Sequence, residues 1–549
     1  MLQGSTSKFS TVQSFTDQFK QTHSISSEES YTDKLTQWMY CHPAAVKTAE
    51  KIGGAVGVGL MALAPTLAFG PAVWAVLVGG GCTAVSYAAH KALDIIVPPH
   101  HDMKEHAFKP CEMEGAKLYY KGDIPILELD YSDPRKAGYS QGYMLGSHFN
   151  EMLSKLDLAK WMGELPDAKN VNRTLAEIKE KMLQEPLATA YVEEMEGLVA
   201  GFNDWSKEIN GSKGREITFN DILIFHIMPD SLHFSPEAYE IGLINSQTEE
   251  VNEDEIEELE ANEAEPLVAC TVVMDKDPEI GVVVGRNMDW PTAGIFGTNT
   301  LMVHRKHPNE KHSTIEVGFP GFIGTLTGMN FQSKQALEEQ QAKTPSTFEI
   351  FRNYFREDET PSLALSMNVA SGDTKEINGM PAAIFNRMCL ENCPNVSKAE
   401  ELVNEKPPMG PYHLSLADST SKARAKSIHL FQGDKKQHIA REWSNNTPLV
   451  TTNCNYTGKK KMTDHMHYSE ERHEIIGQYF TEAKQNISKE GLNRTELVKG
   501  SLELPYVDNS LTAHKVIMLP GQKKIQVAFD NAFAGGAKLH ELDITDLQK

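Results

Sequence analysis

The most informative hydrophobic pattern of the chain is in the stretch that begins at Cys270. A β-branched run follows Cys270, a turn occurs at 277–279, and a second β-branched run comes after the turn. Two short apolar runs around a proline-containing turn predict a β-hairpin. The second run continues into Gly-Arg-Asn-Met-Asp-Trp at 285–290. Because a hairpin brings its open ends together, we expect Arg286 and Asp289 to lie near Cys270.

The pattern on either side of this hairpin predicts a mixed α and β protein. Before it, a strand is expected at 124–129 and an amphipathic helix at 188–205, and glycines 138, 142 and 146 favour close backbone packing of a helix. After it, the chain alternates as strands do, with two helices between them. The expected strands are 300–304, 314–330 (a pair), 363–368, 412–418, 427–431, 449–453, 512–519 and 524–529, and the helices are 382–391 and 399–404.

A long uncharged run occupies the N-terminal part of the chain. No Asp, Glu, Lys or Arg occurs between Ile52 and Ala89, and about 20 apolar residues suffice to cross a bilayer. Phe69-Gly-Pro71 in its middle is a helix breaker. We therefore expect a membrane hairpin. A single tilted span and a buried Gly/Ala-rich helical pair are the alternatives. The hairpin and the single span would put the part of the chain after residue 91 on opposite sides of the membrane.

Composition divides the chain into five segments. Ten acidic residues crowd positions 249–265, and their mutual repulsion predicts a solvated linker. Residues 1–50 are polar without strong periodicity and predict an arm that is partly ordered or disordered. The segments are the polar arm 1–50, the hydrophobic segment 51–91, a leader region 92–245, the acidic linker 246–269 and a catalytic domain 270–549.

Net charge and cysteine content exclude several classes of partner. The formal charge of -22 argues against nucleic acid, which a polyanionic protein would repel. The seven cysteines show no paired Cys/His spacing typical of structural zinc. No metal and no cofactor is implied.

The motifs around Cys270 resemble one enzyme family. Cys-Thr at the head of a strand, with Arg-Asn-Met-Asp-Trp about sixteen residues later, is similar to the choloylglycine hydrolase, acid ceramidase and N-acylethanolamine acid amidase superfamily. The stretches 314–330 and 449–456 resemble the same superfamily. Residues 138–146 and 188–205 resemble the leader of its acyl-CoA:6-aminopenicillanic acid acyltransferase branch. The resemblance spans about 120–535 and is densest from 268 to 456.

This resemblance implies a fold and a maturation step. The family consists of N-terminal-nucleophile (Ntn) hydrolases, which implies an α+β fold, a four-layer αββα sandwich of two antiparallel sheets. Here a helical leader region and the N-terminal hydrophobic membrane segment would precede it. The resemblance also implies self-cleavage between Ala269 and Cys270, after which the two fragments stay associated.

The resemblance assigns roles to individual residues. Cys270 would be the nucleophile, and its freed α-amine, with a pKa of about 7.7–8.0, would be the base. Arg286 and Asp289 would hold the cysteine and the substrate, and Asn453 would donate to the oxyanion. Three further residues match substrate- or oxyanion-binding positions: Asn368, Arg472 and Asn330. The match of Arg472 is looser because a Lys-Lys-Lys run and a longer gap precede it.

Each of these residues also has an ordinary structural role. A lone cysteine is usually a small core residue, neighbouring Arg and Asp commonly form an ion pair, and asparagines at strand ends cap turns. Their ordered set around one cysteine favours the catalytic interpretation.

The sequence therefore predicts a membrane-associated, self-processing cysteine amidase that acts on a linear amide of an N-acyl lipid, such as a ceramide or an N-acylethanolamine. An acyltransferase with the same acyl-Cys270 intermediate and an inactive membrane-anchored scaffold are the alternatives. A papain-like protease would need a paired histidine, and neither His413 nor His467 lies in such a pattern. The compartment is not fixed by the sequence.

Overall fold

The computed structural model describes the chain in segments. These are residues 9–23, 108–161, 172–231, 269–289, 299–308, 311–332, 362–370, 379–406, 408–409, 411–420, 422–430, 438–444, 447–454, 468–488, 491–508, 512–529 and 538–547.

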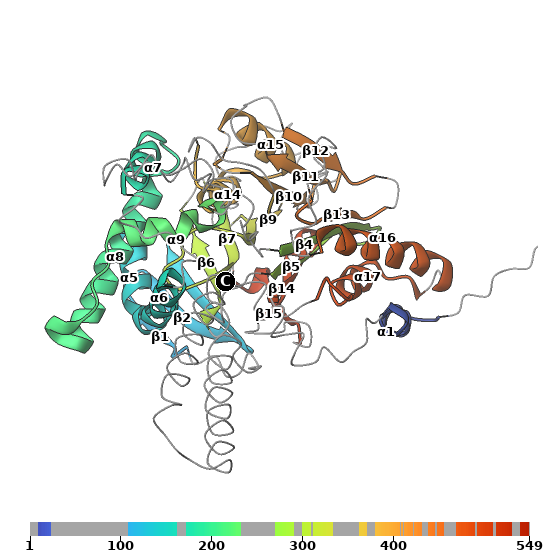
Figure 1. Ribbon diagram of the computed structural model, residues 1–549, viewed down its shortest axis with the longest axis horizontal. Helices are drawn as coiled ribbons and strands as arrows, with labels where there is room; N and C mark the ends of the chain where they lie inside the picture. The colour runs from blue at the N-terminus through green and yellow to red at the C-terminus, as the bar shows by residue number, and fades with distance from the viewer. Residues whose placement is uncertain are drawn as a thin grey trace, which may run out of the picture.

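Two β-sheets form the centre of the protein (Figure 1). The ten-stranded sheet has the order β1 (Cys111–Met113), β2 (Ala116–Lys121), β3 (Ile124–Asp130), β6 (Leu301–Lys306), β7 (Ser313–Gly318), β8 (Thr327–Phe331), β9 (Leu363–Val369), β10 (Tyr412–Asp418), β11 (Ala425–Leu430) and β12 (His438–Glu442). The six-stranded sheet has the order β13 (Leu449–Thr451), β4 (Ala269–Asp277), β5 (Gly281–Asp289), β14 (Thr512–Leu519), β15 (Lys524–Phe529) and β16 (His540–Asp543).

The two sheets pack face to face over an apolar layer. Val272 and Val284 of the six-stranded sheet belong to one buried cluster with Met302 and Ile315 of the ten-stranded sheet. Val273, whose side chain points the other way, is buried as well, in the cluster beneath the helices. A strand that is covered on both faces has no polar side. This explains why the β-branched runs after Cys270 are nearly continuous.

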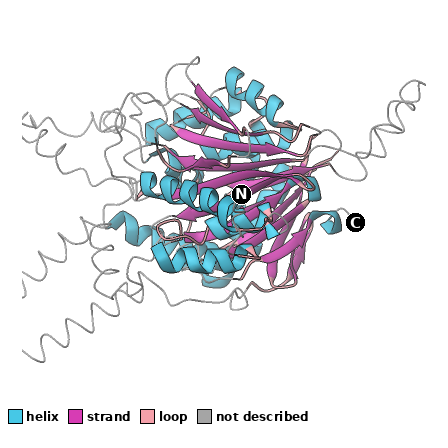
Figure 2. Cartoon of the chain, turned by 90° about the vertical axis from the view of Figure 1, so that its right-hand side faces the viewer, coloured by secondary structure: helices cyan, strands magenta, loops and turns pink. Residues whose placement is uncertain are grey.

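Helices cover the outer face of each sheet, and Figure 2 shows the resulting layers. The helices on the side of the ten-stranded sheet are α5 (Pro134–Met144), α6 (Gly146–Trp161), α7 (Asn172–Gln184), α8 (Thr189–Asn210), α9 (Phe219–Ser231), α14 (Ala382–Asn392) and α15 (Val396–Glu405), of which α7 packs on α8 and α9. The six-stranded sheet packs against α1 (Val12–His23), α16 (Ser469–Asn486) and α17 (Arg494–Ser501). The described part of the chain thus has a helix–sheet–sheet–helix order, and the predicted mixed α+β class is confirmed.

The leader region differs from the prediction in two ways. It is not helical throughout, because besides the expected strand at 124–129, which is β3, it contributes β1 and β2 to the ten-stranded sheet. The sheets are also not purely antiparallel, because β3 pairs with β6 in parallel, from Ile126 opposite Met302 to Asp130 opposite Lys306. A parallel pair needs a long crossover connection, and here the rest of the leader, the acidic linker and the β4–β5 hairpin separate the two strands. Leader and catalytic parts therefore share one sheet.

The glycine spacing correctly predicts close helix packing in the leader. α5 and α8 touch through their backbones: a Cβ atom added to Gly138 would lie 2.0 Å from the Glu194 carbonyl oxygen, and one on Gly142 would lie 2.3 Å from that of Leu198. Only residues without a side chain allow two helices to approach this closely. Another leader helix, α9, begins directly after Thr218, which forms reciprocal hydrogen bonds with Asp221.

The N-terminal arm contains a helix that the sequence analysis did not predict. In α1, Val12, Phe15 and Phe19 are buried against α16 and α17. Thr16 forms a 2.7 Å hydroxyl hydrogen bond with Tyr479 of α16. The arm is thus ordered over 9–23 by packing of one apolar face.

Two predictions concern residues that the structure for the most part does not describe. The hydrophobic segment 51–91 and the acidic linker up to residue 268 are not among the described residues. None of the helices that are described has both the length and the apolar character for a membrane span.

Candidate active site

The predicted hairpin is present and places Cys270 at the start of a central strand. β4 and β5 pair in antiparallel register, with Ala269 opposite Asp289, Cys270 opposite Met288 and Val272 opposite Arg286. Side chains alternate along a strand. Cys270, Met288 and Arg286 therefore face the ten-stranded sheet, whereas Asp289 belongs to the alternate face. The hairpin by itself brings Arg286 to the cysteine.

Arg286 contacts the sulfur of Cys270. Its Nη2 lies 3.4 Å from Cys270 Sγ and donates to Met367 O at 2.6 Å, while Nη1 contacts Leu326 O and Thr327 Oγ1. Cys270 and Arg286 are 2% and 1% exposed, so this arrangement is isolated from bulk water. The planar guanidinium suits a site with several fixed acceptors. A fixed cation at this point would stabilise negative charge that develops on the sulfur or on a bound carbonyl.

Three other predicted residues surround the main chain of Cys270. The backbone N–H of Cys270 donates to Asn453 Oδ1 at 2.9 Å. Its carbonyl oxygen accepts from Arg472 Nη1 at 2.6 Å and from Asn368 Nδ2 at 3.2 Å. Arg472 Nη2 also donates to Asn453 Oδ1, at 2.9 Å. Arg472, which belongs to α16, is completely buried.

The amide groups of the two asparagines are partly committed to the backbone. Asn453 donates from Nδ2 to Val369 O at 2.8 Å, which leaves its second N–H hydrogen for a ligand. Asn368 Nδ2 donates toward Thr451 O and Thr452 O as well as toward Cys270 O. Asn368 thus fastens β4 to the end of β13, and an oxyanion role for it stays a prediction.

Asp289 and Asn330 are placed differently. Asp289 lies opposite Ala269, next to the predicted scissile bond, and its Oδ1 accepts from Thr512 Oγ1 at 2.6 Å. Asn330 is not brought to Cys270 by any described contact. Its side chain binds the carbonyls of Leu390 and Cys393 at the end of α14 and the N–H of Leu363. These bonds give Asn330 a structural function.

The structure adds three polar residues that sequence reasoning missed. Thr327 contacts Arg286, Ser469 Oγ accepts from Asn453 N at 2.9 Å, and Thr512 binds Asp289. Thr327 lies in the stretch that resembles the superfamily, and Ser469 opens the helix that contains Arg472. These positions in the sequence are the signals by which Thr327 and Ser469 could have been found. His514 on β14 lies 3.3 Å from Thr327 Oγ1, and burial together with the charge of Arg286 lowers the pKa of His514 well below its usual value.

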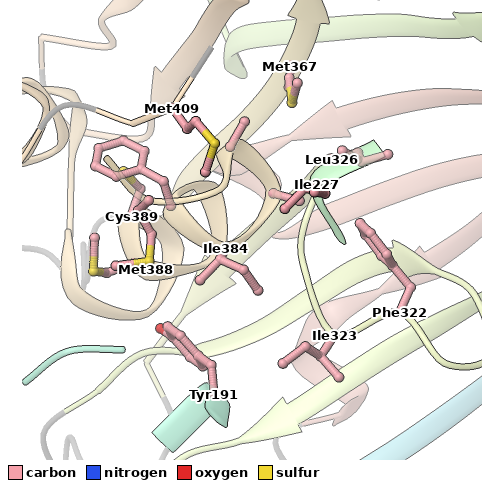
Figure 3. Close-up of a cluster of buried hydrophobic side chains, with 14 of the residues drawn as sticks. Tyr191, Ile227, Phe322, Ile323, Leu326, Met367, Ile384, Met388, Cys389 and Met409 are labelled. Atoms are coloured by element: carbon pink, nitrogen blue, oxygen red, sulfur yellow. The ribbon is translucent and has the colours of Figure 1, made fainter. Parts of the chain in front are cut away.

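Cys270 belongs to a large buried apolar cluster. Its other members include Met288, Phe322, Leu326 and Met367. Figure 3 shows a part of this cluster that contains the last three of these residues among aliphatic, aromatic and methionine side chains. The methionine side chain is flexible and adapts to irregular apolar shapes. Cys270 is therefore part of a continuous apolar core.

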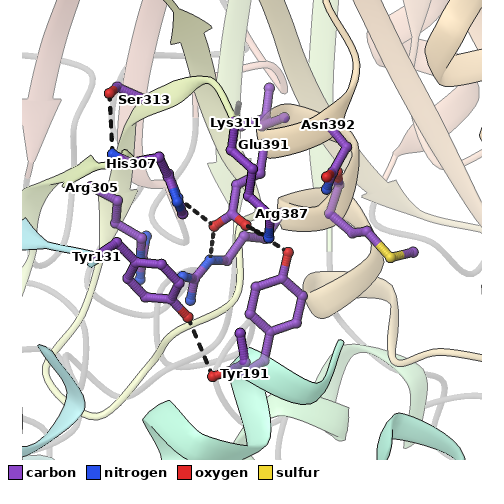
Figure 4. A network of polar contacts seen from close by, with 12 residues as sticks. Tyr131, Tyr191, Arg305, His307, Lys311, Ser313, Arg387, Glu391 and Asn392 are labelled. Carbon is purple, nitrogen blue, oxygen red and sulfur yellow. Dashed lines mark hydrogen bonds and ion pairs between the residues drawn. The ribbon is translucent and has the colours of Figure 1, made fainter. Parts of the chain in front are cut away.

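A buried ionic network joins the leader to the catalytic part (Figure 4). Arg387 of α14 donates to Glu391 Oε1 at 2.6 Å and contacts Glu194 of α8, while Arg305 contacts Glu316. Burial opposes the charge of Arg387, but the Glu194 and Glu391 carboxylates outweigh it and raise the pKa of Arg387. The hydroxyls of Tyr131 and Tyr191 donate to Glu194 and Glu391 at 2.7 and 2.8 Å.

Metal chemistry has no candidate site in the described residues, where no three His, Cys, Asp or Glu side chains are grouped for a metal ion. The described cysteines are all free, which includes Cys389 and Cys393.

Comparison with protein families gives one match. The family model described as acyl-coenzyme A:6-aminopenicillanic acid acyl-transferase matches residues 362–532. This stretch includes Asn368, Asn453 and Arg472, and it ends close to the last strands of the six-stranded sheet. No curated protein sequence matches the chain significantly.

Solved structures with similar folds include two amide hydrolases. A Caenorhabditis elegans N-acylethanolamine-hydrolyzing acid amidase ortholog has 18% sequence identity and a TM-score of 0.33, covering 46% of this chain and 93% of that one. A variant of conjugated bile acid hydrolase from Clostridium perfringens has 11% identity and a TM-score of 0.31, covering 50% of this chain and 93% of that one. Similarities at this level do not establish a shared activity.

Proposed function

We propose, from the premise that this chain belongs to the Ntn-hydrolase superfamily, that it is a self-processing cysteine amidohydrolase. The observation that carries the proposal is the convergence on Cys270. Arg286 contacts its sulfur, Asn453 its nitrogen, and Arg472 and Asn368 its carbonyl oxygen. Any buried residue needs partners for its backbone N–H and carbonyl, but packing of a core cysteine does not require an arginine on its sulfur.

Self-cleavage would use the same cysteine. Cys270 Sγ adds to the Ala269 carbonyl, the Ala269–Cys270 C–N bond breaks, and the proton lost by the thiol ends on the new α-amine. Water then hydrolyses the resulting thioester between Ala269 and the sulfur, which leaves a free carboxylate on Ala269 and a free thiol. Asn453, which already accepts from Cys270 N, would go on to orient the amine.

Substrate hydrolysis would repeat the chemistry on an external amide. The neutral α-amine takes the thiol proton, Sγ attacks the substrate carbonyl, and the amine delivers the proton to the departing nitrogen. Water then cleaves the acyl-Cys270 thioester and releases the acid. The second N–H of Asn453 would donate to the oxyanion, and one such donor is typically worth about 3–4 kcal/mol.

The proposed substrate is a linear, non-peptide amide of an N-acyl lipid. The membership of Cys270 in a large buried apolar cluster supports an acyl chain as the apolar part of the substrate. Membrane association through residues 52–89, which rests on their uncharged sequence, would bring the enzyme to such a substrate. Association of the two fragments after cleavage is supported by the β3–β6 pairing and by the Glu194–Arg387 contact.

An acyltransferase is the second candidate. The family model that matches residues 362–532 describes an acyl-transferase. In this reaction an amine, in place of water, would attack acyl-Cys270 and leave with the acyl group as a new amide. Incubation with a labelled N-acyl donor and a primary amine distinguishes the two, because hydrolysis yields free acid and transfer yields the new amide.

Intact mass and N-terminal sequencing of purified protein test the proposal. We expect two fragments, the second of which begins Cys-Thr-Val-Val, and a single uncut chain for Cys270→Ala. Cys111→Ser, which changes an exposed thiol, is the matched control and should be cut like the wild type. A wild-type chain that stays whole and inert toward N-acyl amides would contradict the proposal and favour an inactive scaffold.

A further inference from the structure

The loop that connects β7 to β8 forms one wall beside the nucleophile. This loop, residues 319–326, reads Phe-Pro-Gly-Phe-Ile-Gly-Thr-Leu. Its last carbonyl, Leu326 O, accepts from Arg286 Nη1 and from Met367 N, the latter at 3.1 Å. Because Arg286 Nη2 in turn contacts Cys270 Sγ, the position of the 319–326 loop fixes one end of the guanidinium that touches the sulfur.

Residues from elsewhere bind several polar backbone groups of this loop. Thr325 N donates to Ala383 O at 2.9 Å, and Asn386 Nδ2 donates to Thr325 O at 3.2 Å. Arg387 and Arg305 donate to Ile323 O at 2.9 and 3.2 Å. These partners all belong to the catalytic part of the chain.

Two partners of the loop come from the leader. His226 of α9 accepts from Ile323 N at 2.7 Å through Nε2, and Gln141 of α5 donates to Phe322 O at 3.4 Å. The His226 ring also stacks on Phe322, with centroids 4.7 Å apart and planes 6° from parallel. After cleavage at residue 270, His226 and Ile323 would belong to different fragments.

The two contacts of His226 determine its protonation. Nδ1 lies 2.7 Å from Ile222 O, which can only accept, so Nδ1 must have the hydrogen. Nε2 faces the N–H of Ile323, which can only donate, so Nε2 must present its lone pair. The ring is therefore neutral, with both nitrogens satisfied. Burial lowers the pKa of His226 to about 3, which agrees with this tautomer.

We propose that His226 is a positioning residue through which the leader fragment fixes the 319–326 loop, and with it Arg286, against Cys270. This inference rests on the proposed function. It adds that the leader takes part in setting up the nucleophile and is more than a remnant of processing. The alternative is that His226 is an ordinary buried histidine whose loss only lowers stability.

A pair of substitutions separates the two interpretations. In His226→Gln, the side-chain oxygen can occupy the place of Nε2 and accept from Ile323 N. In His226→Leu, the size is similar but Ile323 N is left buried without its acceptor, which disfavours the present position of the loop. His304→Leu is the control, because His304 is also buried in the large sheet but lies against Glu128, away from the loop.

The readouts are the rate of Cys270 alkylation by iodoacetamide, followed by peptide mass, and the kcat and KM of amide hydrolysis, all on the processed full-length protein. We expect His226→Leu to change the alkylation rate and lower kcat by about tenfold, which corresponds to about 1.4 kcal/mol. His226→Gln should stay within about threefold of the wild type. His304→Leu should lower the thermal midpoint without changing either rate.

Two results would overturn the inference: an unchanged alkylation rate in His226→Leu, or equal losses in His226→Leu and His226→Gln. The alkylation rate needs no amide turnover. An enzyme without amidase activity but with the expected alkylation pattern would therefore contradict the proposed function and leave the role of His226 supported.

Discussion

Replacement of Gly197 by alanine should force apart the two leader helices that are packed most closely. Gly197 lies on α8 where that helix crosses α5. A Cβ atom at this position would lie 2.0 Å from Arg135 O, 2.8 Å from Arg135 C and 3.0 Å from Tyr139 N. All three atoms belong to the backbone, so no side chain can rotate away. The helices must separate by more than about 1 Å to restore an ordinary carbon–oxygen contact.

The size of the effect follows from two opposing terms. Overpacking of this kind costs about 1–3 kcal/mol, whereas replacing a helical glycine by alanine gains up to about 1 kcal/mol in helix propensity. Gly477 of α16 is exposed and has no atom within 4 Å of its Cβ position. Gly477→Ala keeps the propensity gain without the clash. The difference between the two variants therefore measures the clash alone, about 1–3 kcal/mol.

The comparison is best made in the Cys270→Ala background, so that every sample is an uncut chain. Thermal midpoints should fall for Gly197→Ala and rise slightly for Gly477→Ala. Gly201→Ala, which would meet Tyr139 O at 2.0 Å, should resemble Gly197→Ala. If Gly197→Ala were as stable as Gly477→Ala, α5 and α8 would not be in backbone contact and the structure of the leader would need revision.

Two further predictions concern charge. Arg286→Lys should lower kcat by at least about a hundredfold, because an ammonium group cannot bridge Cys270 Sγ, Leu326 O and Met367 O as the planar guanidinium does. Steady-state kinetics measure this loss, and a variant with the wild-type kcat would contradict the prediction. Burial raises the pKa of Glu391, but Arg387 and His307 outweigh burial and lower this pKa well below 4.5. The stability from ionised Glu391 is thus fully present above about pH 4.5 and lost as the pH falls through its lowered pKa in the folded protein. Glu391→Gln should lower the free energy of unfolding by about 3–5 kcal/mol at pH 7. In denaturant unfolding, the difference in this free energy between variant and wild type should become smaller below pH 4.5. A difference that does not change with pH would refute the ionic role.

The local part of the site was predictable from the sequence. Two residues sixteen positions apart, such as Cys270 and Arg286, come together only if the chain turns back between them. The turn signal at 277–279 indicated that it does. Hairpin register is set by turn geometry and by the apolar pattern. A short stretch therefore sufficed to place the guanidinium beside the sulfur. The same locality explains why the glycine spacing identified the close contact of α5.

The remote part of the site was not predictable in the same way. Arg472 is 202 residues from Cys270 in the chain, and its contact with Cys270 O depends on how α16 packs on the six-stranded sheet. The motif around Arg472 matched the superfamily only loosely, so this contact had little support from the sequence. Asn330 shows why a family-like stretch alone does not place a side chain, because this residue binds the end of α14 and its binding role stays a prediction. The apolar spacing Val12–Phe15–Phe19 could have identified α1, but its burial requires α16 and α17, which lie at the other end of the chain.

The cut at Cys270 would separate two parts that are folded into each other. β3 of the leader pairs with β6, Glu194 of α8 is buried against Arg387, and His226 of α9 holds Ile323. On the opposite side, α1 packs against α17 and against α16, the helix that contains Arg472. The N-terminal fragment thus contacts both outer layers of the catalytic part. Removing it would expose the edge of β6 and leave Arg387 without one of its buried carboxylates, at a cost of several kcal/mol. Processing would therefore free the amine of Cys270 without dismantling the scaffold, and the active enzyme would be the pair of fragments.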